Sequence, residues 1–279
     1  MSMTLVALLG VLCLFLLILL KMPISFAMFM VGFFGMLYMT SPIAAYNVIS
    51  SGIWEQLSGY SLSVIPLFIF MGEVLFRSGI TEKIFAAAYA WIGHFRGSMA
   101  TTTILSSAGF AAVSGSNTAT AATVGTIALP EMKKFGYNRA LSAGSVAAGG
   151  TLGGIIPPSS VLIVIALQAE LAIRDLFLAS IVPGLILIVL FIATIGLLCR
   201  RRLDMGPAGV RSSWSVRWRS LKGIIEIGAL FTLVLGGLFA GWFTSTEAAA
   251  VGCIGAMLIT LIQGKLSWAV LSEAIANAL

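Results

Sequence analysis

The sequence predicts an all-α polytopic membrane protein, and its composition and its apolar runs carry that prediction. Of the 279 residues, 59% are hydrophobic and only 9% are charged, which is more apolar surface than a soluble domain of this size can bury. The apolar runs are continuous rather than alternating, which favours membrane helices over membrane strands. Two polar, glycine-rich segments interrupt these runs, and they carry the functional prediction.

Apolar runs that approach the length of a membrane helix recur along the whole chain. They cover about residues 4–20, 24–40, 60–77, 137–171 (with an interruption), 176–199, 223–242 and 246–263. The first run has no basic residue before it and no cleavage motif after it, so we interpret it as a membrane helix rather than a signal peptide. Residues 81–96 have apolar side chains at helical spacing and charges at both ends, which predicts a helix lying along the membrane surface.

Residues 98–135 predict a re-entrant helical hairpin. Two short arms, about 98–113 and 121–132, are rich in small residues, and the polar sequence Ser-Gly-Ser-Asn-Thr-Ala-Thr occupies 114–120 between them. Two full membrane spans do not fit this length comfortably, whereas a hairpin that turns near mid-depth does. Two short spans joined by an ordinary loop remain the alternative.

Residues 137–171 predict a broken membrane helix. Four glycines at 149, 150, 153 and 154 lower helix stability, and the following Pro157 and Pro158 lack N–H donors but suit the first turn of a new helix. We therefore expect two half-helices that meet near the middle of the membrane, the second beginning near residues 157–160. A kinked helix without a ligand is the alternative.

The basic residues predict the orientation of the chain. If the N-terminus lies outside the cell, every Lys and Arg falls on the cytoplasmic side except Arg174. Residues 200–222, which begin with three consecutive arginines, are then expected to form a basic cytoplasmic loop that touches anionic headgroups.

The two polar breaks predict a carrier for ions and solutes. Backbone groups without a partner cost several kcal/mol in hydrocarbon, so such breaks persist only inside protein or beside a watery cavity. Freed carbonyls at a helix end suit a hard cation such as Na⁺, and freed N–H groups at a helix start suit a carboxylate. Of the intramembrane acids, Glu73 is expected to pair with Arg77, with proton coupling as the alternative, and Glu247 to lie in a first helical turn.

The sequence gives little support to an enzyme or a metalloprotein. His94 is the one histidine, no pair of aspartates falls within the apolar runs, and Cys13, Cys199 and Cys253 lie far apart. We therefore expect no catalytic residue, no disulfide and no cofactor, with Na⁺ acting only as a coupling ion. A channel is also disfavoured, because no ring of like charges is visible.

Several segments together resemble the large membrane subunit of TRAP transporters, the DctM-like family. These segments are residues 66–73, 106–120, 130–132, 136–137, 148–153, 156–159 and 241–248. The resemblance extends over nearly the whole chain and corresponds to about the first two-thirds of the family pattern. One departure is Ser245, where the family usually has proline.

The resemblance implies a permease subunit of a bacterial inner-membrane uptake system that is driven by Na⁺ rather than ATP. Such a subunit pairs with a small four-helix membrane subunit and an extracytoplasmic solute-binding protein, and the system takes up organic acids such as C4-dicarboxylates, keto acids or sialic acid. A transport domain would slide against a scaffold in an elevator mechanism. The implied parts are a scaffold (1–80), an arm helix (81–97), a transport-domain part (98–199), a basic loop (200–222) and the start of a second inverted repeat (223–279).

The resemblance also implies the site residues. The sodium set is Ser114, Ser116, Asn117, Gly150, Gly153 and Pro157, and the set facing the substrate carboxylate is Asn117, Thr118 and Ser159. Family members are longer and contain a second hairpin and a second broken helix. We therefore expect that this polypeptide alone does not complete a transport cycle; a truncated assembly fragment and a proton-coupled carrier are the alternatives. The sequence does not identify the acid that is carried.

Overall fold

The computed structural model describes residues 2–278, and within them the chain forms α-helices, two short 3₁₀ helices and no strand. The chain divides into two units, Met1–Leu62 and Ser63–Leu279, with the 3₁₀ helix η1 (Tyr60–Ser63) at their boundary. Three helices of the second unit are long and apolar enough to cross a membrane. The all-α membrane fold predicted from the sequence is therefore confirmed.

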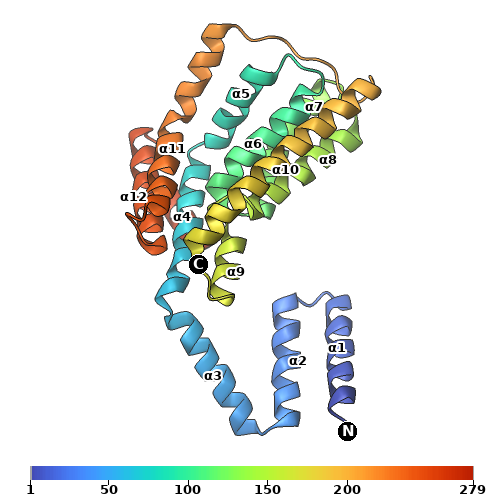
Figure 1. Cartoon of the computed structure of the whole chain (residues 1–279), viewed down its shortest axis with the longest axis vertical. Helices are drawn as coiled ribbons and strands as arrows, with labels where there is room; N and C mark the ends of the chain where they lie inside the picture. The colour runs from blue at the N-terminus through green and yellow to red at the C-terminus, as the bar shows by residue number, and fades with distance from the viewer. Residues whose placement is uncertain (1, 279) are drawn as a thin grey trace. The chain divides into compact units, whose positions relative to one another are not determined.

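The first unit consists of α1 (Met3–Leu19), α2 (Ile24–Met39) and α3 (Pro42–Ser58) (Figure 1). α1 and α2 contain 17 and 16 residues, slightly fewer than the ~20 of a typical span, and they are apolar around their whole circumference. α1 packs against α2, and Ser41 caps the start of α3. The two helices match the first two predicted apolar runs within one residue.

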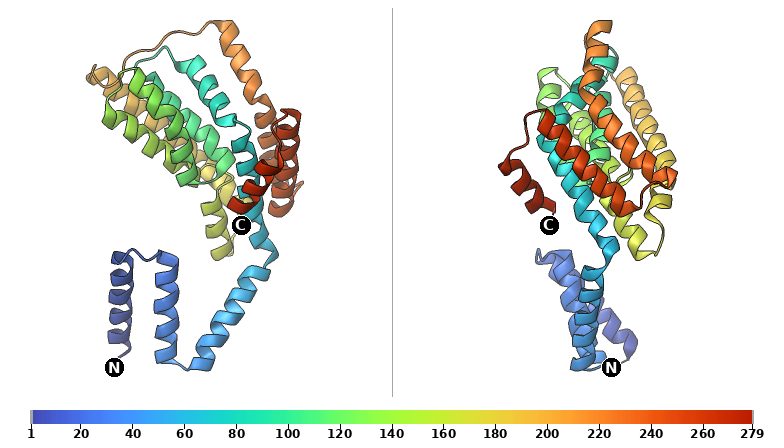
Figure 2. Two further views of the ribbon diagram at one scale, coloured as in Figure 1. Left: turned by 180° about the vertical axis from the view of Figure 1, so that it is seen from behind. Right: turned by 90° about the vertical axis from the view of Figure 1, so that its left-hand side faces the viewer.

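The second unit contains the helices that position the site (Figures 1 and 2). They are α4 (Val64–Arg77), α5 (Ile80–Ile92), α6 (Ser98–Ser114), α7 (Asn117–Lys134), α8 (Arg139–Thr151), η2 (Leu152–Gly154), α9 (Ser160–Gln168), α10 (Ile173–Arg201), α11 (Trp214–Ala240), α12 (Ser245–Ile262) and α13 (Trp268–Ala278). By length and composition α10, α11 and α12 are the three candidate spans, and α4 with α5 forms a further apolar pair that is bent by 69°.

The second unit has two hydrophobic cores. One joins α4, α9 and the start of α10 to α11 and α12, around Phe68, Met71 and Phe177. The other surrounds α6, which packs against α5, α7, α8 and α10 and buries Ile104 and Phe110. α6 is buried on nearly every side, and most of its residues are small. Small side chains let the backbones of neighbouring helices come close to it.

The polar loop between α10 and α11 is shorter than the sequence predicts. We expected a loop over 200–222, but α10 continues to Arg201 and α11 begins at Trp214. Ser213 caps the new helix by accepting a hydrogen bond from the Val216 N–H, and Trp91 of α5 packs edge-on against the rings of Trp214 and Trp218. A search for continuous apolar sequence misses the start of α11, because the charged residues in its first turns lower the local hydropathy.

The loop between α10 and α11 is anchored by Tyr137, which lies in the turn between α7 and α8. Its hydroxyl donates to the Pro207 carbonyl at 3.0 Å and accepts from the Met99 N–H at 3.1 Å. Gly206 lies against the ring, since a Cβ there would be 2.6 Å from a ring carbon. The turn, the start of α6 and the loop are thus held together by one phenol.

Replacing Tyr137 by phenylalanine is expected to lower the free energy of unfolding by about 1–3 kcal/mol, because two backbone groups lose their partner. Burial raises the pKa of the Tyr137 phenol. A raised pKa means that the stabilisation is fully present below pH about 10 and is lost as the pH rises through the higher native value. Denaturation of parent and variant at neutral and alkaline pH measures both effects; identical curves would contradict the assignment.

Two acidic residues behave as the sequence predicts. Glu73 lies 3.7 Å from Arg77, so the expected i, i+4 ion pair is confirmed. Glu247 lies in the first turn of α12, where its carboxylate accepts from the N–H and hydroxyl of Thr244 while its own N–H donates to the Thr244 hydroxyl. This reciprocal capping box fixes the start of α12, as expected for a first-turn acid.

Candidate functional site

The hairpin tip and the helix break meet at Gly115. α6 ends at Ser114, and Gly115 follows in the left-handed conformation with φ 59°. The Gly115 carbonyl accepts two hydrogen bonds from Ser160, one from its N–H at 3.1 Å and one from its hydroxyl at 2.9 Å. A side chain could not replace the glycine, because a Cβ there would lie 2.6 Å from the Pro158 carbonyl oxygen. We call this contact between residues 114–120 and 149–160 the tip–break crossing.

Glycines in the break bring its backbone onto the tip. A Cβ at Gly153 would lie 2.4 Å from the Ser116 carbonyl oxygen and 2.9 Å from the Asn117 amide nitrogen. A Cβ at Gly154 would lie 2.9 Å from the side-chain oxygen of Asn117. All three distances are shorter than real Cβ contacts, so these two positions need glycine for close approach rather than for an unusual φ.

Gly150 continues the same contact one turn earlier. A Cβ there would lie 2.7 Å from the Ala121 Cβ and 3.3 Å from the Asn117 carbonyl oxygen. Gly149 faces the other way, where a Cβ would lie 2.3 Å from the Ser107 hydroxyl of α6. The end of α8 therefore fits between both arms of the hairpin, which explains why glycines are paired at this point.

The end of α6 offers unpaired carbonyl oxygens to the crossing. Within residues 2–278, the carbonyls of Ala112, Val113 and Ser114 accept no hydrogen bond, because Gly115 turns the chain and its N–H takes the Ala111 carbonyl. Such terminal carbonyls carry the negative end of the helix dipole. Their chemistry suits a small hard cation.

The start of α7 offers the opposite chemistry. Asn117 and Thr118 are exposed, and within the described chain their N–H groups donate no hydrogen bond. The Ser116 hydroxyl caps the helix by accepting from the Ala119 N–H at 3.4 Å, and it also lies 3.2 Å from the Thr118 hydroxyl. Free N–H groups at the positive end of an 18-residue helix suit a carboxylate.

The other site residues predicted from the resemblance occupy varied positions. The Ser114 hydroxyl lies 2.9 Å from the Thr120 hydroxyl, on the face of the tip that borders a cavity. Pro157 is buried within the break. Ser159 is fully buried, caps α9, and donates its hydroxyl to the Gly154 carbonyl at 3.0 Å. In this structure Ser159 therefore faces the protein, and its contact with a substrate stays a prediction.

A cavity of about 310 Å³ lies beside the tip, and the sequence did not reveal all of its lining. Its polar lining residues are Glu73, Ser114, Ser116, Thr123, Ser160 and Asn277. Asn277 of α13 donates to the Glu73 carboxylate at 3.0 Å, and Glu273, one turn earlier, pairs with Arg77. The four-residue spacing of Glu273 and Asn277 places them on one face of α13 and could have indicated a polar contact. The sequence did not show that this contact is with α4.

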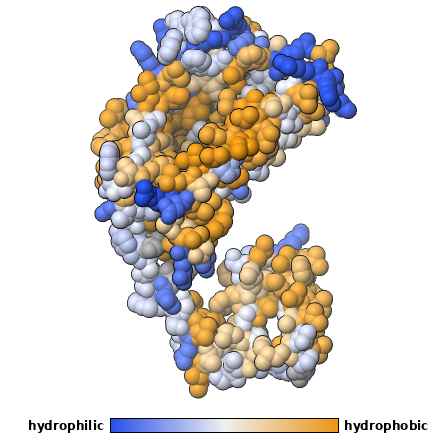
Figure 3. All heavy atoms as spheres, in the orientation of Figure 1, coloured by the Kyte–Doolittle hydropathy of each residue, from blue (hydrophilic) through white to orange (hydrophobic). Residues whose placement is uncertain are grey.

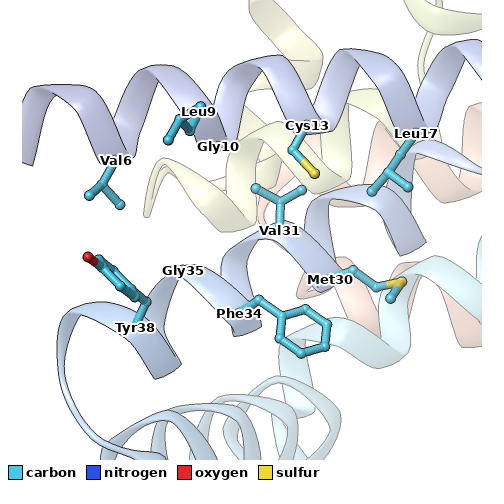
Figure 4. A pocket seen from close by; sticks show the side chains of 10 residues that line it. All are labelled: Val6, Leu9, Gly10, Cys13, Leu17, Met30, Val31, Phe34, Gly35 and Tyr38. Carbon is cyan, nitrogen blue, oxygen red and sulfur yellow. The ribbon is translucent and has the colours of Figure 1, made fainter. Parts of the chain in front are cut away.

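A groove of about 420 Å³ in the first unit has different chemistry (Figure 4). It lies between α1 and α2, and the labelled residues Cys13, Val31 and Phe34 represent its apolar lining, with the Tyr38 hydroxyl as a polar exception. No charged side chain lines it, so it is a poor candidate for an ion or a carboxylate. In the described part of the chain, no group of three or more His, Cys, Asp or Glu residues could hold a metal ion.

The helical membrane fold and the crossing of a hairpin tip with a broken helix define a protein of the membrane permease class. The chain belongs to the family described as the DctM component of the tripartite ATP-independent periplasmic transporter, whose family model matches residues 11–279. Residues 11–279 include both halves of the crossing and all the helices of the second unit.

Individual relatives agree with this family. The chain is 37% identical over 211 residues to the C4-dicarboxylate TRAP transporter large permease protein DctM of Pseudomonas aeruginosa, covering 75% of this chain and 48% of the relative. It is 28% identical over 247 residues to the sialic acid TRAP transporter large permease protein SiaM of Vibrio cholerae, covering 88% and 57%. It is 29% identical over 246 residues to the ectoine/5-hydroxyectoine permease protein UehC of Ruegeria pomeroyi, also covering 88% and 57%.

The chain spans about half the length of these curated relatives in the matched regions. The region shared with them contains one hairpin and one broken helix. The substrates in the relatives' names differ.

Proposed function

We propose that the chain acts as the permease part of a tripartite, ATP-independent uptake system for organic acids in a bacterial inner membrane, with its N-terminus outside. Membership of the DctM family supports this proposal. The observation that carries it is the tip–break crossing, where free carbonyls at the end of α6 adjoin free N–H groups at the start of α7. One short segment can thus attract a cation and a carboxylate together.

The proposed coupling ion is Na⁺. Its ligands would come from backbone carbonyls and small polar side chains of Ser114, Ser116, Asn117, Gly150, Gly153 and Pro157. The close approach of Gly150 and Gly153 to the tip supports this set, because it places two irregular backbone segments side by side. Oxygen ligands from irregular backbone are how broken helices hold coupling ions in membrane carriers.

The proposed substrate site lies at the exposed start of α7. The N–H groups and side chains of Asn117 and Thr118 would receive a carboxylate, and Ser159 at the start of α9 would join them after a rearrangement of its buried hydroxyl. The relatives' names include a C4-dicarboxylate, sialic acid and ectoine, so the proposal stops at the class of organic acid.

The proposed mechanism is an elevator movement in which hairpin and broken helix move as one body. The two hydrogen bonds from Ser160 to Gly115 support this, because they tie the two elements together. The 69° bend between α4 and α5, at Gly79 with φ 77°, is a suitable joint between moving and fixed helices. A small four-helix membrane subunit and an extracytoplasmic solute-binding protein are the proposed partners.

Asn117→Ala is expected to weaken Na⁺ binding at least tenfold, because it removes the side-chain amide that lies against Gly154. A bound ligand stabilises the native state by about 2.7 kcal/mol at one hundred times its Kd, so thermal denaturation of the purified chain in NaCl and in choline chloride measures the effect. Asn47→Ala in α3 is the matched control and should keep the Na⁺-dependent shift.

Two results would contradict the proposal in different ways. An equal Na⁺ shift in parent and Asn117→Ala would exclude the crossing as the sodium site. A shift that depends on pH but not on Na⁺, and that Glu73→Gln abolishes, would favour the proton-coupled alternative. That alternative has one specific support, since the Glu73 carboxylate borders the cavity beside the tip.

A further inference from the structure

A second cavity in the second unit combines apolar walls with two arginines. Its volume is about 670 Å³, and it lies between α10 and the segment that runs from the end of α5 into α6. Ile92, Phe95 and Leu105 form one wall, and Ile192 and Leu197 of α10 form the other. Phe95 and Leu197 are both more than half exposed, at 59% and 53%, so apolar surface continues from the cavity to the outside of the protein.

The two arginines, Arg96 and Arg200, lie at the same end of this cavity. Their sequence neighbours are in contact, because a Cβ at Gly97 would lie 2.7 Å from the Cys199 sulfur. The backbone of Arg96 is also fixed, by a bridge to Ala208 of the loop after α10. The positions of both arginines are therefore set by packed backbone, although their side chains are exposed.

Neither arginine has an acidic partner. Among the described residues both ion pairs belong to Arg77, which lies at the end of α4. Two like charges at one cavity mouth repel each other unless an anion lies between them. Planar guanidinium groups bind phosphate oxygens through paired N–H donors, which makes a phosphate a suitable anion.

The apolar walls of the cavity make a small free anion a poor match for the whole site. A phosphate alone would contact the arginines and leave the apolar part of the cavity unfilled. An amphiphile fills both parts, with its charged group at the arginines and a hydrocarbon chain between α5 and α10. Figure 3 shows the same distribution on the surface of the second unit, with apolar side chains along α10 and hydrophilic ones at its basic end.

We propose that this cavity binds one anionic phospholipid from the membrane leaflet on the basic side, with its phosphate between Arg96 and Arg200 and an acyl chain against Ile92 and Ile192. The site is separate from the tip–break crossing, and the proposal does not depend on which ion or acid the protein carries. A lipid here would join the end of α5 to α10.

Native mass spectrometry of the purified 279-residue chain, titrated with phosphatidylglycerol, tests the headgroup contact. One lipid should stay bound, and the Arg96→Gln/Arg200→Gln double variant should raise the apparent Kd at least tenfold. The Arg201→Gln/Arg202→Gln double variant is the matched control, because it removes the same charge nearby without touching the cavity lining, and its Kd should stay within twofold of the parent. An equal loss in both double variants, or equal retention of phosphatidylcholine, would overturn the proposal.

A second variant tests the acyl-chain contact while both arginines remain. Ala193 of α10 lines the cavity, so Ala193→Phe should fill it and lower phosphatidylglycerol retention at least fivefold. Glycerol phosphate and inorganic phosphate should not compete with the lipid at millimolar concentration. Undiminished retention in Ala193→Phe, or displacement of the lipid by free phosphate, would show that only the arginines bind and would overturn the proposal. Unchanged elution and helical circular dichroism confirm that each variant is folded.

Discussion

Replacing Gly153 by alanine is expected to separate the hairpin tip from the helix break and to abolish the Na⁺-dependent stabilisation of the protein. The added methyl would lie 2.4 Å from the Ser116 carbonyl oxygen and 2.9 Å from the Asn117 amide nitrogen, and both are backbone atoms that no rotamer change can move. Overpacking usually costs about 1–3 kcal/mol, and a clash with backbone falls at or above the top of that range. Thermal denaturation with and without NaCl measures both losses.

The control for this change is Gly144→Ala in α8, the helix that leads directly into η2, where Gly153 lies. A Cβ at Gly144 meets nothing within 4 Å, so the substitution should leave the Na⁺ response intact. It should also stabilise α8 by about 0.5–1 kcal/mol, because alanine is the better helix former. If Gly153→Ala kept the full Na⁺ response, the crossing would not be the ion site; if both variants lost it, the cause would be a general weakness of α8.

Replacing Gly72 by alanine is expected to have an effect of similar size at a different contact. Gly72 lies on α4 where that helix crosses the end of α6, and a Cβ would lie 2.5 Å from the Val113 carbonyl oxygen and 3.2 Å from the Ser114 Cα. The methyl would push α4 away from the hairpin and displace one of the three unpaired carbonyls. We expect a loss of about 3 kcal/mol or more in the free energy of unfolding, together with weaker Na⁺ binding.

Gly228→Ala in α11 is the control for the Gly72 variant. Nothing lies within 4 Å of a Cβ at Gly228, so this substitution should be neutral or slightly stabilising. Comparing the two midpoints at constant protein and detergent concentration separates the α4–α6 contact from the general effect of adding a methyl to a membrane helix. A Gly72 variant as stable as the Gly228 variant would mean that α4 is not held against the hairpin end.

The positions of the hairpin and of the break were predictable because both depend on local backbone chemistry. Glycine at 115 is needed for a left-handed helix end, and the prolines at 157 and 158 cannot continue the hydrogen-bonding pattern of α8. These signals fixed the end of α6 at Ser114 and the start of α9 at Ser160, close to the predicted limits. The path of the hairpin through a bilayer stays a prediction.

The contacts between distant helices could not be predicted. Asn277 and Glu273 contact Glu73 and Arg77 from about two hundred residues away in the sequence, and nothing in the local sequence of either helix indicates its partner. The start of α11 at Trp214 was missed for a different reason, because a capped and charged first turn has the composition of a loop. Ser213, a residue type that favours helix N-caps, followed by apolar residues at helical spacing, was the sequence signal for the start of α11.

The Gly115 carbonyl accepts hydrogen bonds from both the N–H and the hydroxyl of Ser160. Positions 115 and 160 should therefore differ in how many substitutions they tolerate. One donor is the amide of residue 160, which every amino acid except proline possesses, so that half of the link survives most substitutions there. The acceptor residue, Gly115, cannot be replaced in this way, because it has a positive φ and no room for a Cβ. Random mutagenesis should therefore recover many functional replacements at position 160 and almost none at position 115. The geometry of the crossing is thus fixed by the backbone at 115, and the residue at 160 can vary around it.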